Sequence, residues 1–247
     1  MSEDMEMDVQ SSTRAPVRAA MIDLDGTLVD TLGDFVQALG LMLDDLQLPA
    51  IEAQQVARMV GKGSQHLLRS VLAQVLQVRD ADDAPAALVD ALYPQAWRQY
   101  QHHYEEINGR YASVYPGVVQ GLTALRAAGL PLACLTNKPT VFAHQLLRAK
   151  ELAGFFDHVF GGDAFEQKKP DPIPLIKTCE ALGFAPAQVL MVGDSSNDAQ
   201  AARAAGCPVV LVTYGYNHGE PVRAVDADGY VNALQELVPM WACALVE

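Results

Sequence analysis

The chain has 247 residues and half of them are hydrophobic, so it can bury one sizeable core with a smaller insertion and is not disordered. Acidic side chains outnumber basic ones by 30 to 17, a formal net charge of −13, which argues against nucleic acid as a main partner. No apolar run approaches the ~20 residues that span a membrane, so no membrane partner is expected. Any anionic substrate must be held by a local positive site.

The start of the chain and its cysteines indicate a cytoplasmic protein. Residues 1–15 are polar and acidic, without the basic start and apolar core of a signal peptide, and we expect a disordered tail there. The cysteines show no CxxC or zinc-like spacing and are expected to be small core residues rather than disulfides. They are Cys134, Cys179, Cys207 and Cys243.

A short apolar run at 19–22 suits a strand that is buried on both faces of a parallel sheet. From residue 32 to residue 111 the periodicity is helical instead, and no strand-like run appears. Helices are expected from about Phe35 to Pro49, over 64–78 and over 84–106. We therefore predict a helical domain at 32–111, inserted into a core formed by residues 16–31 and 112–247.

From Tyr115 onward strands and helices alternate. Apolar runs that predict strands lie at 130–135, 155–160, 189–192 and 209–212. Helices are expected after Gly117, Pro139 and Pro172 and over 199–205, with a short strand at 230–231 and a last helix from Asn232. This alternation predicts an α/β fold with a doubly wound, mostly parallel sheet. Ligands bind at the carboxyl ends of the strands in such sheets.

Unusual polar residues follow these apolar runs. An Asp-Gly pair such as Asp25–Gly26 is by itself typical of a turn. Here, however, at least three other apolar runs also end in polar residues suited to phosphate. The groups expected to meet at these ends are Asp23, Asp25, Thr136, Asn137, Lys169, Asp194 and Asp198.

Carboxylates that face hydroxyl, amide and ammonium donors predict a site for a hard cation and a phosphate. Mg²⁺ prefers oxygen ligands and is often held by one or two carboxylates plus substrate oxygens. An aspartate that attacks a phosphate anion meets like-charge repulsion, which a divalent cation and Lys169 would offset. Such an aspartate can form an aspartyl-phosphate, while a second carboxyl group two residues away could act as general acid and base.

The chain resembles the haloacid dehalogenase superfamily of phosphotransferases. Its four motifs occur in order and at the ends of the expected strands. The first is Met21 to Thr27 (hydrophobic residues followed by Asp-x-Asp-Gly-Thr), the second is Thr136, the third is Lys169 before a proline, and the fourth is Gly193-Asp194-x-x-x-Asp198. The likeness extends from about Val17 to Leu237 and implies a Rossmann-like core, with the helical insert as the small cap domain of this superfamily.

The resemblance also implies roles for individual residues. Asp23 would be the nucleophile and Asp25 the general acid/base. A Mg²⁺ ion would be held by the Asp23 carboxylate, the Asp25 backbone carbonyl and Asp194. Thr136, Asn137 and Lys169 would bind the transferred phosphoryl group, and Asp198 would hold Lys169 or a metal-bound water.

Within the superfamily the chain is most similar to bacterial phosphoglycolate phosphatases. The stretches that carry this likeness are Thr136–Pro139, Gly161–Asp163, Lys168–Pro172 and Thr213–Asn217. The implied substrate is 2-phosphoglycolate, a small phosphate ester. Other small esters such as sugar phosphates, a phosphomutase, and a non-catalytic module remain as alternatives, and the oligomeric state is open between monomer and homodimer.

The cap offers weaker signals about specificity. Lys62 lies in a Gly61-Lys62-Gly63 turn, where it is either a solvated turn residue or a contact for the substrate carboxylate. Arg58 and Arg69 are the other basic residues considered for that contact. His66, His102 and His103 lack metal-ligand spacing and are expected to have no catalytic role.

Overall fold

The computed structural model describes residues 16–79 and 86–241, so the tail expected at 1–15 and Cys243 lie outside the described residues. In the described part, six parallel strands form one sheet in the order β5-β4-β1-β6-β7-β8. They are β1 (Ala19–Ile22), β4 (Leu132–Leu135), β5 (His158–Phe160), β6 (Val189–Gly193), β7 (Val209–Val212) and β8 (Gly229–Val231). The predicted parallel α/β sheet is confirmed.

β1 lies at the centre of the sheet, with β4 on one side and β6 on the other. Met21 is in register with Ala133 of β4 and with Met191 of β6. All four residues of β1 are fully buried, which explains why this strand reads as a continuous apolar run. Because the order of the strands reverses at β1, the residues that follow it stand where such sheets bind ligands.

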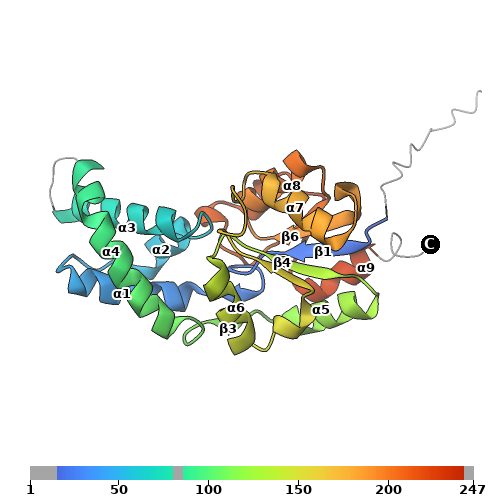
Figure 1. Ribbon diagram of the computed structural model, residues 1–247, viewed down its shortest axis with the longest axis horizontal. Helices are drawn as coiled ribbons and strands as arrows, with labels where there is room; N and C mark the ends of the chain where they lie inside the picture. The colour runs from blue at the N-terminus through green and yellow to red at the C-terminus, as the bar shows by residue number, and fades with distance from the viewer. Residues whose placement is uncertain (1–15, 80–85, 242–247) are drawn as a thin grey trace, which may run out of the picture.

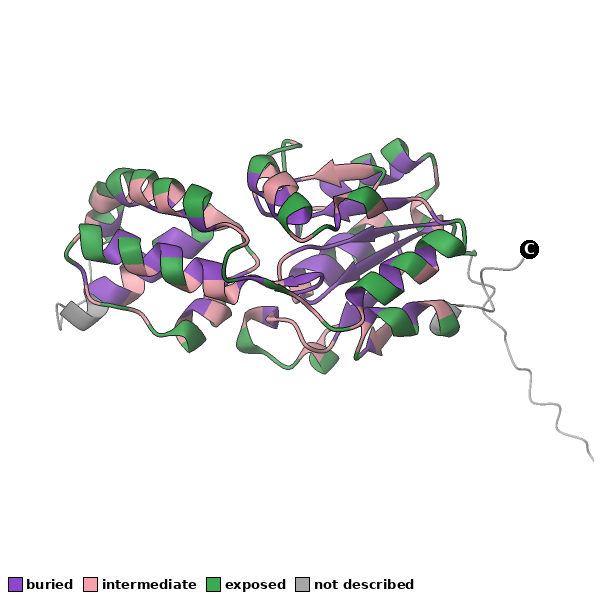
Figure 2. Ribbon diagram, turned by 90° about the horizontal axis from the view of Figure 1, so that it is seen from below, coloured by how far each residue is buried: buried purple, intermediate pink, exposed green. Residues whose placement is uncertain are grey.

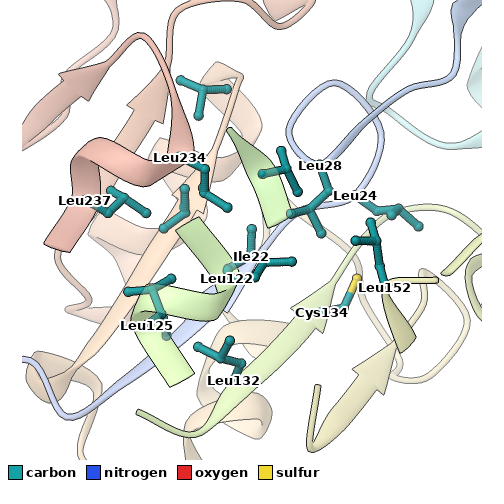
Figure 3. Packing of buried hydrophobic residues seen from close by; sticks show 14 of the residues in the cluster. Ile22, Leu24, Leu28, Leu122, Leu125, Leu132, Cys134, Leu152, Leu234 and Leu237 are labelled. Carbon is teal, nitrogen blue, oxygen red and sulfur yellow. The ribbon is translucent and has the colours of Figure 1, made fainter. Parts of the chain in front are cut away.

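Helices cover both faces of the sheet, as the alternation of side chains along the strands requires. Ile22 and its neighbours pack against α5 (Val118–Ala127), α6 (Thr140–Ala149) and α9 (Leu237–Trp241) on one face (Figure 3). Met21 and its neighbours pack against α7 (Ile173–Leu182) and α8 (Ser196–Ala205) on the other. Figure 1 shows α7 and α8 on one side of the strands and α5 on the opposite side. The predicted doubly wound arrangement is confirmed.

Four helices form the inserted cap, which lies at one end of the molecule (Figure 1). They are α1 (Leu32–Asp45), α2 (Ala53–Met59), α3 (Ser64–Arg79) and α4 (Ala86–Ile107). These helices enclose a third hydrophobic core, which Phe142 of α6 joins from the sheet domain (Figure 2). The helical insertion is confirmed as part of the fold, whereas its exact bounds at 32 and 111 stay a prediction.

Short elements complete the described chain. The strands β2 (Val29–Asp30) and β3 (Ser113–Val114) pair antiparallel, so the segments that enter and leave the cap run side by side. The 3-10 helices are η1 (Ala153–Phe155), η2 (Pro186–Gln188), η3 (Asn217–Gly219), η4 (Val222–Ala224) and η5 (Leu234–Glu236). The helix expected from Asn232 therefore starts later, as η5 followed by α9. Among the described helices, none combines the length and hydrophobicity needed to cross a bilayer.

Candidate active site

The two aspartates of the first motif follow β1 directly. The backbone N–H of Asp23 donates to the carbonyl of Val192 at 2.9 Å, which extends the pairing of β1 with β6 by one residue. The chain then turns back, and the N–H of Gly26 donates to the carbonyl of Val29. Asp23 is buried and Asp25 is partly buried, so both carboxyl groups stand at the end of the strand rather than in bulk solvent.

Lys169 is the buried cation beside Asp23. Its Nζ lies 3.0 Å from Asp23 Oδ1, and it donates to Asp198 Oδ1 at 2.7 Å and to the carbonyl of Leu135 at 2.8 Å. Burial works to lower the pKa of Lys169, but the carboxylates of Asp198 and Asp23 raise it overall. The ammonium group therefore stays protonated and offsets part of the negative charge of the site.

Three carboxylates converge next to this lysine. Asp23, Asp194 and Asp198 each place one oxygen within 4.8 Å of the others. Burial, followed by the charge of Asp198, raises the pKa of Asp194 to about 8. Burial also raises the pKa of Asp23 to about 7, although Lys169 opposes the shift. Three ionised carboxylates would carry more negative charge than one lysine balances, so without a further cation the site retains protons on Asp23 and Asp194.

The hydrogen bonds of Asp194 and Asp198 distinguish these two carboxylates. Asp198 Oδ1 accepts from Lys169, while its Oδ2 accepts from Ser195 Oγ at 2.7 Å and from the Ser195 N–H at 3.1 Å. Asp194 accepts from Thr27 Oγ1 at 3.2 Å and from the Tyr216 N–H at 2.7 Å. Both carboxylates thus have both oxygens engaged, and in the described chain the difference is that Asp198 accepts from Lys169, in keeping with a group that holds this lysine.

The donor set of this cluster fits a hard divalent cation. Its ligands are carboxylate oxygens, which Mg²⁺ and similar ions prefer, and a bound cation would offset the repulsion between the ionised carboxylates. The backbone also closes tightly around Asp194, since a Cβ atom on Gly26 would lie 2.5 Å from Asp194 Oδ2. Glycine at position 26, with a φ of +87°, permits this approach.

The second motif stands at the end of β4. The Thr136 N–H donates to the carbonyl of Phe160 at 3.0 Å, which fixes the end of the strand. The Asn137 side-chain amide donates to the carbonyl of Lys169 at 2.8 Å and to the carbonyl of Gly61 in the cap at 3.0 Å. Asn137 therefore links the second motif to the loop that carries Lys169 and to the cap.

A cavity between the core and the cap opens onto these residues. It is narrow, with an accessible volume of about 30 Å³. Its walls come from the core and from the cap: Asp23, Asp25, Thr136, Asn137, Lys138, Phe35, Val60, Gly61, Gly63, Ser64 and Leu67. The structure therefore places the two aspartates of the first motif, Thr136 and Asn137 around one cavity at the end of the sheet.

Lys138 also lines this cavity, and no role was expected for it from the sequence. Its Nζ lies 3.1 Å from Asp25 Oδ1 and donates to Tyr104 Oη of the cap at 2.5 Å. Asn197 was missed as well, and its amide donates to the Gly61 carbonyl at 3.2 Å. The Thr136–Pro139 stretch pointed to this loop, but it could not assign a role to Lys138, because the partners of Lys138 are distant in sequence.

The basic residues considered in the cap lie elsewhere. Lys62 is exposed and lines a neighbouring hollow with His66, Lys168 and Lys169. Arg69 pairs with Asp90 at 2.5 Å, on the outside of the cap. The side chain of Arg58 lies beside Gly219. A role of Lys62 in specificity therefore stays a prediction.

Comparison with known proteins identifies the family. A model of the haloacid dehalogenase-like hydrolases matches residues 20–212. The chain belongs to this family. The hydrolase is 43% identical over 225 residues to the phosphoglycolate phosphatase of Thiobacillus denitrificans, covering 91% of this chain and 96% of that protein. It is 38% identical to the phosphoglycolate phosphatase of Escherichia coli K12, covering 90% of this chain and 92% of that protein.

Solved structures agree with the family of this hydrolase. A predicted phosphoglycolate phosphatase from Haemophilus somnus is similar with a TM-score of 0.84 and 31% identity, covering 91% of this chain and 97% of that one. CbbY from Rhodobacter sphaeroides, in complex with phosphate, has a TM-score of 0.70 at 22% identity, with coverage of 90% and 96%. The latter likeness concerns the fold alone.

Proposed function

We propose that this hydrolase is a magnesium-dependent phosphatase that converts 2-phosphoglycolate to glycolate and phosphate. The single observation that supports 2-phosphoglycolate as the substrate is the 43% identity to a phosphoglycolate phosphatase over 91% of the chain. The buried cluster of Asp23, Asp194 and Asp198 beside Lys169 supports the chemistry.

In the proposed first step, Asp23 is the nucleophile. One of its carboxylate oxygens forms a bond to phosphorus while the bond between phosphorus and the ester oxygen breaks. Lys169, 3.0 Å from Asp23, would offset the repulsion between the carboxylate and the phosphate. Asp25 gives its proton to the departing glycolate oxygen. The product of this step is an aspartyl-phosphate.

In the proposed second step, Asp25 takes a proton from water, whose oxygen attacks phosphorus. The aspartyl-phosphate bond breaks, inorganic phosphate is released and the Asp23 carboxylate is restored. Thr136 and the Asn137 region would bind the phosphoryl oxygens, and Asp198 would hold Lys169 in place. A Mg²⁺ ion held by Asp23, the Asp25 carbonyl and Asp194 would supply positive charge to the phosphate.

A panel of phosphate esters tests this proposal. Purified protein is assayed for phosphate release from 2-phosphoglycolate, from sugar phosphates and from an aryl phosphate, with Mg²⁺ or with excess chelator. We expect the highest kcat/KM on 2-phosphoglycolate, no turnover in chelator, and recovery when Mg²⁺ is restored. Full turnover in chelator, or a clear preference for sugar phosphates, would contradict it.

Asp23→Asn is the matched variant for the nucleophile. The substitution keeps the shape of the side chain but removes the attacking carboxylate, so turnover should fall by at least about 10³-fold. A circular dichroism spectrum like that of the wild type shows that the fold persists. Turnover at the wild-type rate would exclude Asp23 as the nucleophile.

A further inference from the structure

The side chain of Lys138 is buried between the core and the cap. It lies on the loop between β4 and α6, and its side chain is only 2% exposed. Its Nζ lies 3.1 Å from Asp25 Oδ1 and 2.5 Å from Tyr104 Oη. It also lies 4.9 Å from the ring centre of Phe35 and 4.8 Å from that of Tyr104. A buried ammonium group is thus held where two cap rings meet the catalytic loop.

The same ammonium belongs to the cavity that contains Asp23. Among the described residues that line this cavity, Lys138 is the basic one. Lys169 is engaged by Asp23, Asp198 and the carbonyl of Leu135. Lys62 lines a different hollow. The described lining of this cavity therefore includes one cation, which lies 3.1 Å from Asp25.

We propose that Lys138 binds the carboxylate of the substrate, which makes it a determinant of specificity. This inference rests on the proposed function and adds the class of substrate: short phosphate esters that carry an acidic group. An ammonium group has three N–H donors, and the described contacts with Asp25 and Tyr104 use two of them. The surrounding rings limit access of water and so strengthen an ion pair.

The cap contributes directly to this subsite. Phe35 lies on α1 and Tyr104 on α4, so both rings belong to the cap. Burial raises the pKa of Tyr104 well above its ordinary value, which keeps the hydroxyl group neutral and able to accept from Lys138. The subsite for a substrate carboxylate is therefore shared between the core, which supplies Lys138, and the cap, which supplies the two rings around it.

Paired substrates test this role. The wild type and Lys138→Met are assayed on 2-phosphoglycolate and on the phosphate ester of glycolamide, in which a neutral amide replaces the carboxylate. Loss of one charged hydrogen bond predicts that kcat/KM for 2-phosphoglycolate falls at least about tenfold more than kcat/KM for the amide. Inhibition by glycolate should weaken, while inhibition by inorganic phosphate should not.

Three further variants complete the experiment. Lys138→Arg should keep part of the preference, and Lys177→Met, an exposed lysine on α7, should keep all of it. Equal losses on both substrates would show that Lys138 only holds Asp25 and would overturn the inference. A preference abolished by Lys62→Met instead would also overturn it. Failure of the wild type to hydrolyse 2-phosphoglycolate would contradict the proposed function itself.

Discussion

Gly26 and Gly215 determine where the carboxylate of Asp194 can lie. A Cβ atom on Gly215 would stand 2.1 Å from Asp194 Cβ, and one on Gly26 would stand 2.5 Å from Asp194 Oδ2. Both distances are far below van der Waals contact. The two glycines therefore let the loops after β1 and β7 close around this carboxylate.

Gly26→Ala is expected to displace Asp194 and to weaken metal binding. The new Cβ must push the carboxylate away, so the Mg²⁺ concentration for half-maximal activity should rise at least about tenfold. A titration of activity with Mg²⁺ measures this change. Gly183→Ala is the matched control, because Gly183 has a similar φ of +80° but a Cβ atom there would meet nothing within 4 Å.

The Gly183→Ala control separates the effect of backbone strain from the effect of the steric clash with Asp194. Both substitutions place alanine in a left-handed conformation, which costs about 1–2 kcal/mol. Both variants should therefore lose stability, but only Gly26→Ala should change the Mg²⁺ requirement. An unchanged requirement in Gly26→Ala would show that Asp194 does not need its present position to bind the metal.

The residues that could be predicted from the sequence are those with short, local signals. Asp23 and Asp25 are two positions apart after an apolar strand, and Asp194 and Asp198 share one motif. Lys138 could not be assigned in this way, because its partners Asp25 and Tyr104 lie 113 and 34 residues away. Contacts between the core and the cap depend on how the cap is placed, which no local pattern specifies.

At the scale of elements, Asp34 joins the two ends of the cap. It lies in the first turn of α1 and is fully buried. Its carboxylate accepts from the N–H of Gly109 at 2.6 Å and from the N–H of Tyr111 at 2.7 Å, just after α4. The strands β2 and β3 pair beside this contact, so the entry to and the exit from the cap are held together.

Asp34→Ala is expected to destabilise the protein. Both N–H groups would lose a charged acceptor, which should lower the free energy of unfolding by about 1–3 kcal/mol. Urea denaturation measures the change. Asp44→Ala, an exposed position on the same helix, should change it by less than about 0.5 kcal/mol. Equal stability of the two variants would contradict a structural role of Asp34.

The general layout of the elements was predictable, whereas this junction was not. The long helices and the buried strands have a clear hydrophobic periodicity, so their type and order follow from the sequence. The two-residue strands β2 and β3 are too short to show any periodicity. They form because Val29 meets Val114 across the base of the inserted cap.

At the scale of the whole molecule, the buried carboxylates couple stability to pH and to metal. The pKa of Asp23 is raised to about 7 and that of Asp194 to about 8, above the ordinary value of 3.8. Without metal, the folded protein therefore binds more protons than the unfolded chain between pH 3.8 and about pH 8. The contribution of the two groups to stability is fully present below pH 3.8 and is lost as the pH rises through 7 and 8.

Mg²⁺ is expected to stabilise the protein more at about pH 8.5 than at about pH 6, because protons compete with the metal for the carboxylates at low pH. Thermal unfolding at both pH values, with chelator and with Mg²⁺, measures the difference in Tm. The Asp194→Asn variant serves as the control and should show a smaller effect of Mg²⁺. A larger effect at the lower pH would contradict the assignment of these carboxylates as ligands.

The central position of β1 has a consequence for synthesis on the ribosome. This strand is made early, but its neighbours β4 and β6 begin only at residues 132 and 189. The cap helices lie between β1 and β4 in the chain and pack mainly on one another. Local contacts form faster than contacts between distant segments. In the nascent polypeptide the cap helices are therefore expected to fold first, and the apolar β1 stays unpaired until β4 and β6 have been synthesised.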